Sequence, residues 1–125
     1  MDTHALVLVA DDDPDIRRLV RIRLERSGYT VVSARNGSEA LELAAEWNPD
    51  VAILDVAMPS LDGLEVTRAL RDRLQLVPVI LLTARARESD AHEGAEAGAA
   101  AYITKPFSPH ELEACVRGLI HPRFG

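Results

Sequence analysis

Short runs of branched apolar residues alternate with amphipathic segments along this chain. Apolar runs at Ala5–Ala10, Tyr29–Ala34, Val51–Leu54, Val77–Leu82 and Ala99–Thr104 predict five buried strands. The segments that follow the strands carry apolar residues at helical spacing, which predicts five helices. This alternation is typical of an α/β fold, a doubly wound five-stranded parallel sheet with right-handed crossovers and helices on both faces.

The helices are predicted to bury different amounts of apolar surface. The fourth, Glu88–Ala97, has no large apolar residue, and its Gly94 costs about 1 kcal/mol relative to alanine. Helix starts are predicted at Asp13 with Pro14 and, through a capping box, at Ser108 with Pro109. The inward stripes of the other four helices are predicted to be Ile16, Leu19, Val20 and Leu24; Ala40, Leu41, Ala44 and Ala45; Val66, Ala69, Leu70 and Leu74; and Leu112, Val116 and Leu119.

Composition narrows the class of protein. With 125 residues, the chain forms one domain, which we expect over residues 1–120, with 121–125 as a tail or the start of a linker. A net charge of -6 argues against direct nucleic-acid binding. The single Cys115 cannot form an internal disulfide, which fits a reducing, cytoplasmic location and a structural role for that thiol. No apolar segment approaches membrane-spanning length, so no membrane association is expected.

Polar residues gather where the predicted strands end. Asp11 and Asp12 follow the first strand, Asp55 ends the third, Thr83 ends the fourth, and Lys105 follows the fifth. Because the carboxyl ends of parallel strands meet at one edge of a sheet, we expect these five side chains to converge.

Three converging carboxylates need a cation, since two of them about 4 Å apart repel by roughly 4 kcal/mol at an effective dielectric near 20. Oxygen ligands favour Mg²⁺, with Mn²⁺ as the second choice. A phosphoryl group would complete the set, because Thr83 can donate a hydrogen bond to it and Lys105, the only lysine among 14 basic residues, can pair with an oxygen. Asp55 is then the natural nucleophile and would form an aspartyl phosphate.

Four segments in this order and spacing carry a specific resemblance. They are Leu8–Asp12, Ile53–Pro59, Leu82–Ala84 and Tyr102–Phe107. Along nearly its whole length the chain resembles a response-regulator receiver domain of two-component signalling, similar to the chemotaxis regulators. The resemblance implies a flavodoxin-like sheet with strand order 2-1-3-4-5.

The resemblance also implies roles for individual residues. Asp55 would accept a phosphoryl group from a phosphohistidine on a sensor kinase or phosphotransfer protein, and Lys105 would contact that group. Asp11, Asp12, Asp55 and the backbone carbonyl of Ala57 would hold Mg²⁺. Thr83 and Tyr102 would be the switch pair, and the Lys105-Pro106 bond would be cis.

A receiver of this kind would act as a phosphorylation-activated switch, and not as an enzyme beyond its own phosphorylation and dephosphorylation. Phosphorylation would change the Glu88–Ile120 surface for a downstream target or a fused output domain. The chain would be a monomer or a weak, phosphorylation-dependent dimer.

Several positions depart from the family pattern. Ala57, two residues after Asp55, has no polar side chain, whereas Arg85, two after Thr83, is long and cationic. We hypothesise that Ala57 and Arg85 set the lifetime of the phosphorylated state. Ala100 and Ala101 lie where regulators with a winged-helix output often carry acidic residues, which argues against dimerisation by that contact.

Other interpretations of the same residues remain open. A haloacid-dehalogenase-like phosphatase would need a second acidic residue at the position of Ala57. A flavodoxin-like protein would bind the phosphate of its cofactor after the first strand, where the Asp11–Asp13 run would repel that phosphate. A phosphorylation-independent interaction module of receiver fold is the remaining alternative. Asp13 is interpreted as a helix cap and Trp47 as a packing residue. The arginines of the first helix form a solvated face or a kinase-docking face; they are Arg17, Arg18 and Arg21.

Overall fold

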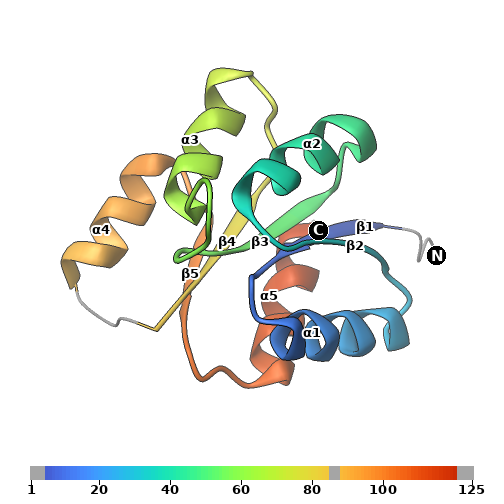
Figure 1. Cartoon of the computed structure of the whole chain (residues 1–125). Coiled ribbons are helices and arrows are strands. Elements are labelled where there is room, and N and C mark those ends of the chain that lie inside the picture. The colour runs from blue at the N-terminus through green and yellow to red at the C-terminus, as the bar shows by residue number, and fades with distance from the viewer. Residues whose placement is uncertain (1–4, 85–87, 121–125) are drawn as a thin grey trace, which may run out of the picture.

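The computed structural model describes residues 5–84 and 88–120, with side chains described from residue 92 onward in the second range. Strands and helices alternate through these ranges (Figure 1). The strands are β1 (Leu6–Ala10), β2 (Thr30–Ala34), β3 (Val51–Asp55), β4 (Val79–Thr83) and β5 (Ala101–Thr104). The helices are α1 (Pro14–Arg26), α2 (Gly37–Trp47), α3 (Gly63–Asp72), α4 (Glu88–Ala97) and α5 (Pro109–Ile120). The predicted α/β class is confirmed.

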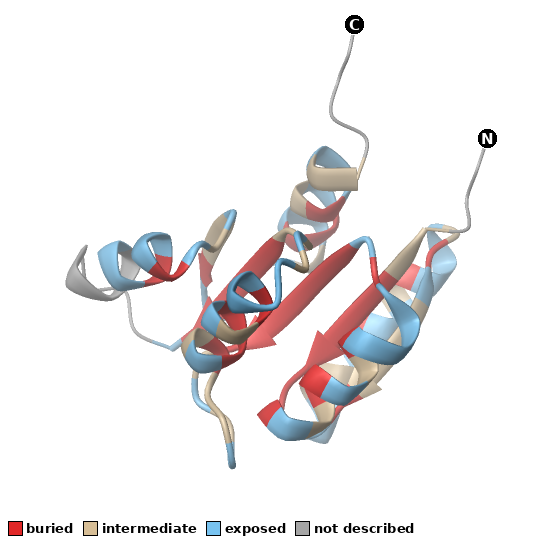
Figure 2. Cartoon of the chain, turned by 90° about the horizontal axis from the view of Figure 1, so that it is seen from above, coloured by how far each residue is buried: buried red, intermediate tan, exposed pale blue. Residues whose placement is uncertain are grey.

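The strands form one parallel sheet in the order β2-β1-β3-β4-β5, as the resemblance implies. Helices α1 and α5 cover one face, and α2, α3 and α4 cover the other (Figure 1). Every residue of β3 and β4 is buried, because both faces of these strands lie under helices (Figure 2). The sheet therefore separates two apolar layers and brings the carboxyl ends of β1, β3 and β4 side by side.

Neighbouring residues on the central strands pack into different layers. Ile53 joins the layer under α1 and α5, where the buried helix residues are Val20, Leu24, Leu112 and Val116. Leu54 joins the layer under α2 and α3. This period-two alternation fixes which side chains can reach the end of each strand.

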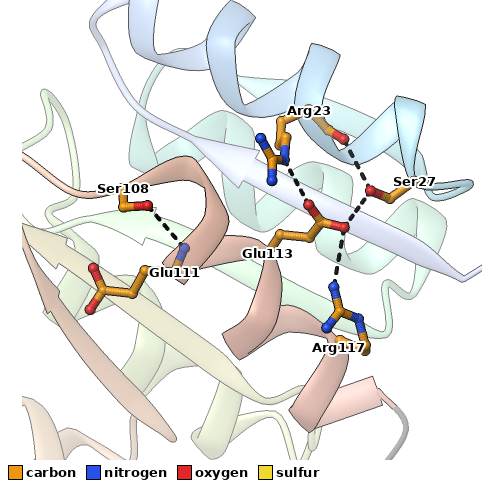
Figure 3. Close-up of polar contacts among 6 residues, drawn as sticks. All are labelled: Arg23, Ser27, Ser108, Glu111, Glu113 and Arg117. Carbon is orange, nitrogen blue, oxygen red and sulfur yellow. Dashed lines mark hydrogen bonds and ion pairs between the residues drawn. The ribbon is translucent and has the colours of Figure 1, made fainter.

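Short polar side chains begin the helices. Asp13 accepts from the Asp15 amide at 2.9 Å, with Pro14 at the first position of α1, as predicted. Ser108 accepts from the Glu111 amide at 3.3 Å, but only this half of the predicted capping box forms in the described structure (Figure 3). A complete capping box starts α3 instead, between Asp62 and Glu65.

Some predicted core positions are wrong. Leu74 is 82% exposed, because α3 ends at Asp72 and Leu74 turns away with a left-handed φ of 58°. Leu19 lies on the flank of α1 and is 46% exposed, and Ala45 is exposed as well. Trp47, interpreted as a packing residue, is also half exposed at the last position of α2.

A buried acid joins the first and last helices. Glu113 on α5 accepts hydrogen bonds from Arg23 Nε at 2.7 Å, from Ser27 Oγ and from Arg117 Nη2 at 3.3 Å (Figure 3). Hydrogen bonding from Ser27 and then from Arg23 lowers the pKa of Glu113 to about 2. We call Arg23, Ser27, Glu113 and Arg117 the α1–α5 clamp.

The described helices are all short compared with a bilayer. A span needs about 20 apolar residues, and none of the helices within 5–84 and 88–120 has the length and apolar character for it.

Candidate functional site

An open cleft of about 850 Å³ lies at the carboxyl ends of the strands. Its lining includes all five side chains that the sequence predicts to converge: Asp11, Asp12, Asp55, Thr83 and Lys105. Each reaches the cleft for the predicted reason, namely that parallel strands end at the same edge. Tyr102 and Ala57 also line it.

Three carboxylates form the floor of this cleft. Asp11 is completely buried, Asp55 is 6% exposed and Asp12 is exposed. Each offers an oxygen within 4.8 Å of an oxygen of the other two. Such a group of oxygen donors, open to solvent through Asp12, fits a hard divalent cation that keeps some of its water.

Lys105 lies between two of the carboxylates. Its Nζ is 3.0 Å from Asp11 Oδ2 and 3.3 Å from Asp55 Oδ2. Burial works to lower the pKa of Lys105, but the hydrogen bond to Asp11 and the charge of Asp55 outweigh it, so that the pKa is raised. Lys105 therefore stays charged. The Lys105-Pro106 bond that follows is cis, as the resemblance implies.

The single positive charge of Lys105 does not balance the negative charge of the neighbouring carboxylates. Burial and then the negative charge of Asp11 raise the pKa of Asp55 to about 6, against the lowering effect of Lys105. At neutral pH, ionisation of Asp55 therefore costs free energy. A further cation beside the carboxylates would remove this cost, and for that reason the donor set suits Mg²⁺ or Mn²⁺.

Backbone groups of the loop after β3 position Asp55. The Ala57 amide donates to Asp55 Oδ1 at 3.3 Å, and the Gly63 amide donates to the Val56 carbonyl at 2.9 Å. A Cβ on Gly63 would lie 2.5 Å from the Asp55 carbonyl oxygen, so only glycine allows α3 to start this close to the strand. Sequence reasoning missed this role; glycine at the first position of a helix was the available signal.

Asp11 is held by the turn that leads into α1. Its Oδ1 accepts from the Asp13 amide at 2.9 Å, and its carbonyl oxygen accepts from Arg17 Nη1 at 2.7 Å. Sequence reasoning assigned Arg17 to a solvated or docking face and missed this contact. The arginine lies six residues after Asp11, across a turn, and no regular spacing rule connects such positions.

The predicted switch residues lie on neighbouring strands. Thr83 ends β4 and is 4% exposed, and Tyr102 on β5 pairs in register with Leu81. The Tyr102 ring packs against α4, where a Cβ on Gly94 would lie 3.2 Å from Tyr102 Cδ1. Arg85, for which we predict an effect on phosphoryl lifetime, lies outside the described residues.

The comparisons with known proteins agree with this geometry. A family model described as the response regulator receiver domain matches residues 7–117. The chain is 46% identical over 114 residues to the alkaline phosphatase synthesis transcriptional regulatory protein PhoP of Bacillus subtilis, covering 91% of this chain and 48% of that protein. It is 45% identical over 114 residues to the transcriptional regulatory protein ResD of Bacillus subtilis, with 91% and 47% covered. The chain thus spans about half the length of these relatives.

Solved structures agree in fold. The receiver domain of the Francisella response regulator 1452 has a TM-score of 0.91 and 38% identity, covering 94% of this chain and 97% of that one. The chemotaxis response regulator CheY4 of Vibrio cholerae has a TM-score of 0.87 and 36% identity, covering 93% and 98%. The family-model match and these likenesses show that the chain belongs to the receiver domains of two-component response regulators.

Proposed function

We propose that this chain is a phosphorylation-activated switch in which Asp55 accepts a phosphoryl group from the phosphohistidine of a sensor kinase or phosphotransfer protein. The observation that carries the proposal is the pairing of Asp55 with Lys105 at 3.3 Å beside the acidic pair Asp11 and Asp12. A carboxylate, an ammonium and a hard-cation site at one strand edge are the parts that phosphoryl transfer needs.

The transfer exchanges one bond to phosphorus for another. An oxygen of Asp55 bonds to phosphorus, the phosphorus–nitrogen bond of the phosphohistidine breaks, and the electron pair stays on the histidine nitrogen. Lys105 is within reach to pair with a phosphoryl oxygen, since its Nζ already contacts Asp55. Asp11, Asp12, Asp55 and the Ala57 carbonyl would hold Mg²⁺, which supplies positive charge to the phosphoryl oxygens when bound.

The switch uses the residues around the cleft. Thr83 bonds the new phosphoryl group and moves toward it, and Tyr102 turns into the space that Thr83 leaves. The Glu88–Ile120 surface then changes for a target or an output domain. Shifting the ratio of active to inactive receiver from 1:99 to 99:1 takes about 5.5 kcal/mol of differential stabilisation. A few charge-assisted hydrogen bonds to the phosphoryl dianion on Asp55 can largely supply it.

The proposal also covers the catalytic scope, cellular location and oligomeric state of the chain. Residues 1–120 form the receiver domain, which catalyses only its own phosphorylation and dephosphorylation, acts in the cytoplasm, and is a monomer or a weak phosphorylation-dependent dimer. With a net charge of -6, the chain itself does not bind nucleic acid directly in this proposal.

Intact mass spectrometry tests the proposal. Wild type and Asp55→Asn are incubated with acetyl phosphate and Mg²⁺, with and without EDTA. The wild type is expected to gain one hydroxylamine-labile phosphate that needs Mg²⁺ and is lost in Asp55→Asn. An adduct that survives Asp55→Asn would show that another residue is the acceptor. No adduct in the wild type would favour the phosphorylation-independent interaction module.

A further inference from the structure

Among Arg17, Arg18 and Arg21 of the first helix, Arg17 bonds to the backbone of Asp11. Arg18 is exposed, and Arg21 pairs with Glu25 at 3.5 Å on the surface of α1. Arg17 instead is partly buried, and its Nη1 donates to the backbone carbonyl of Asp11 at 2.7 Å. These three arginines line one surface hollow, and Arg17 is the one among them that bonds to Asp11.

The hydrogen bonds of Asp11 divide into two kinds. Its amide donates to the Ala34 carbonyl at 3.2 Å, and its two carboxylate oxygens accept from the Asp13 amide at 2.9 Å and from Lys105 Nζ at 3.0 Å. These three bonds fix Asp11 itself. The bond from Arg17 acts on the carbonyl oxygen, and that oxygen lies in the peptide plane that joins Asp11 to Asp12.

Asp12 depends on that peptide plane for its position. Its side chain is exposed and has no hydrogen bond or ion pair to another residue within the described parts of the chain. Even so, it offers an oxygen within 4.8 Å of oxygens of Asp11 and Asp55. Rotation of the Asp11–Asp12 peptide would move this carboxylate away while leaving the other two in place.

We infer that Arg17 is a positioning residue, which fixes the Asp11–Asp12 peptide and thereby keeps the Asp12 carboxylate within range of a divalent cation in the acidic cluster. The inference deepens the proposed function and rests on it. Groups that orient the ligands of a metal typically change its affinity by about 10–100-fold when removed.

The charge of Arg17 makes the test sharp, because its two effects have opposite signs. As a nearby cation, Arg17 repels Mg²⁺, so that its removal would tighten binding. As a positioning residue it supports Asp12, so that its removal weakens binding. Methionine keeps much of the side-chain length and removes both the charge and the donor. Arg18→Met removes the same charge one residue away, without a bond to Asp11, and is the matched control.

The experiment is a calorimetric titration of metal-free protein with Mg²⁺ for the wild type, Arg17→Met, Arg17→Lys and Arg18→Met. We expect Kd to rise about ten-fold in Arg17→Met, to rise less in Arg17→Lys, which keeps a donor, and to stay level or fall in Arg18→Met.

The outcomes separate this inference from the proposed function. If Arg17→Met binds Mg²⁺ as tightly as Arg18→Met while the wild type binds Mg²⁺ and is phosphorylated, the positioning role is wrong and the proposed function stands. If the wild type neither binds Mg²⁺ nor gains phosphate, both are wrong. Melting in EDTA checks that Arg17→Met is folded; if it is not, Arg17→Gln, which also removes the charge and has a shorter side chain, takes its place, and a Kd no higher than that of Arg18→Met then overturns the positioning role.

Discussion

Two buried carboxylates in this molecule, Glu113 and Asp55, have opposite surroundings. Glu113 is 9% exposed and Asp55 is 6% exposed, so burial alone does not distinguish them. Glu113 accepts hydrogen bonds from Arg23, Ser27 and Arg117, and these hold its pKa at about 2. Burial and then the negative charge of Asp11 raise the pKa of Asp55 to about 6, although Lys105 is near.

The difference shows how a fold separates a structural acid from a reactive one. A buried carboxylate that is fully supplied with donors stabilises the packing around it, and the α1–α5 clamp is of this kind. A buried carboxylate with too little positive charge nearby remains costly until a cation or a bonded group compensates it. Asp55 has that property, and it lies in the open cleft.

The two helices beside these acids differ in the same sense. Helix α5 buries Leu112 and Val116 and adds the bonds of Glu113, and two such apolar side chains contribute about 3–6 kcal/mol. Helix α4 contacts the sheet through Gly94 and Ala97 and is held at its end by Arg71, which donates to the Glu96 carbonyl at 2.8 Å. We therefore expect α5 to be the fixed helix and α4 the one that responds to phosphorylation.

Removal of the α1–α5 clamp should have the largest effect. Glu113→Ala leaves Arg23 and Arg117 without their acid, and we expect the free energy of unfolding at pH 7 to fall by about 3 kcal/mol, since the arginines are partly exposed. Urea unfolding measures it, with the exposed Glu111→Ala as control. Because the folded pKa of about 2 lies below the ordinary glutamate pKa of 4.5, this stabilisation is present above about pH 4.5 and is lost as the pH falls toward 2. A loss below 1 kcal/mol would show that the clamp is not structural.

Asp55→Asn should change stability in the opposite direction. Because the folded pKa of about 6 lies above the ordinary aspartate pKa of 3.8, the cost of ionising Asp55 is absent below about pH 4 and grows as the pH rises toward 6. We expect metal-free Asp55→Asn to be more stable than the wild type by about 2 kcal/mol at pH 7 and nearly equal at pH 4. Thermal melting in EDTA measures it, and saturating Mg²⁺ should narrow the gap. Equal stability at pH 7 would contradict the account of Asp55.

Gly63→Ala should displace the backbone of Asp55, the proposed phosphoryl acceptor. The added Cβ would meet the Asp55 carbonyl at 2.5 Å, so that the backbone must shift, at a cost of about 1–2 kcal/mol. We expect slower phosphorylation by acetyl phosphate at saturating Mg²⁺, measured by intact mass. Gly118→Ala is the control, because nothing lies within 4 Å of a Cβ at Gly118. Wild-type phosphorylation kinetics in Gly63→Ala would mean that this contact does not position Asp55.

Gly94→Ala should have the smallest effect on stability, below about 1 kcal/mol, because the gain in helix propensity opposes the tight contacts at 3.1 Å to Leu81 and 3.2 Å to Tyr102. Its effect should appear in the switch instead. The extra methyl restricts the Tyr102 ring, so that phosphorylation should change the Tyr102 fluorescence or NMR signal less than in the wild type. An unchanged response would remove Gly94 from the description of the switch.

Local patterns in the sequence predicted the strands, and the positions of the strand ends predicted the convergence of Asp11, Asp55 and Lys105. The strand order was predicted from the family resemblance instead. The buried state of Glu113 was not predictable, because two of its donors, Arg23 and Ser27, lie 90 and 86 residues earlier in the chain. Leu74 was wrongly placed in the core because the exit of α3 is set by a left-handed residue, which a helical period does not reveal.

Direct titration of the two carboxylates is the most direct test of this account. Carbon-detected NMR of metal-free protein, with Asp55→Asn and Glu113→Gln to assign the signals, gives both pKa values in one series. We expect a pKa of about 6 for Asp55 and of about 2 for Glu113. An Asp55 pKa at or below 4 would mean that its carboxylate is already compensated, and a Glu113 pKa above 4.5 would mean that the α1–α5 clamp is not formed in solution. Either result would contradict the separation between a structural and a reactive acid.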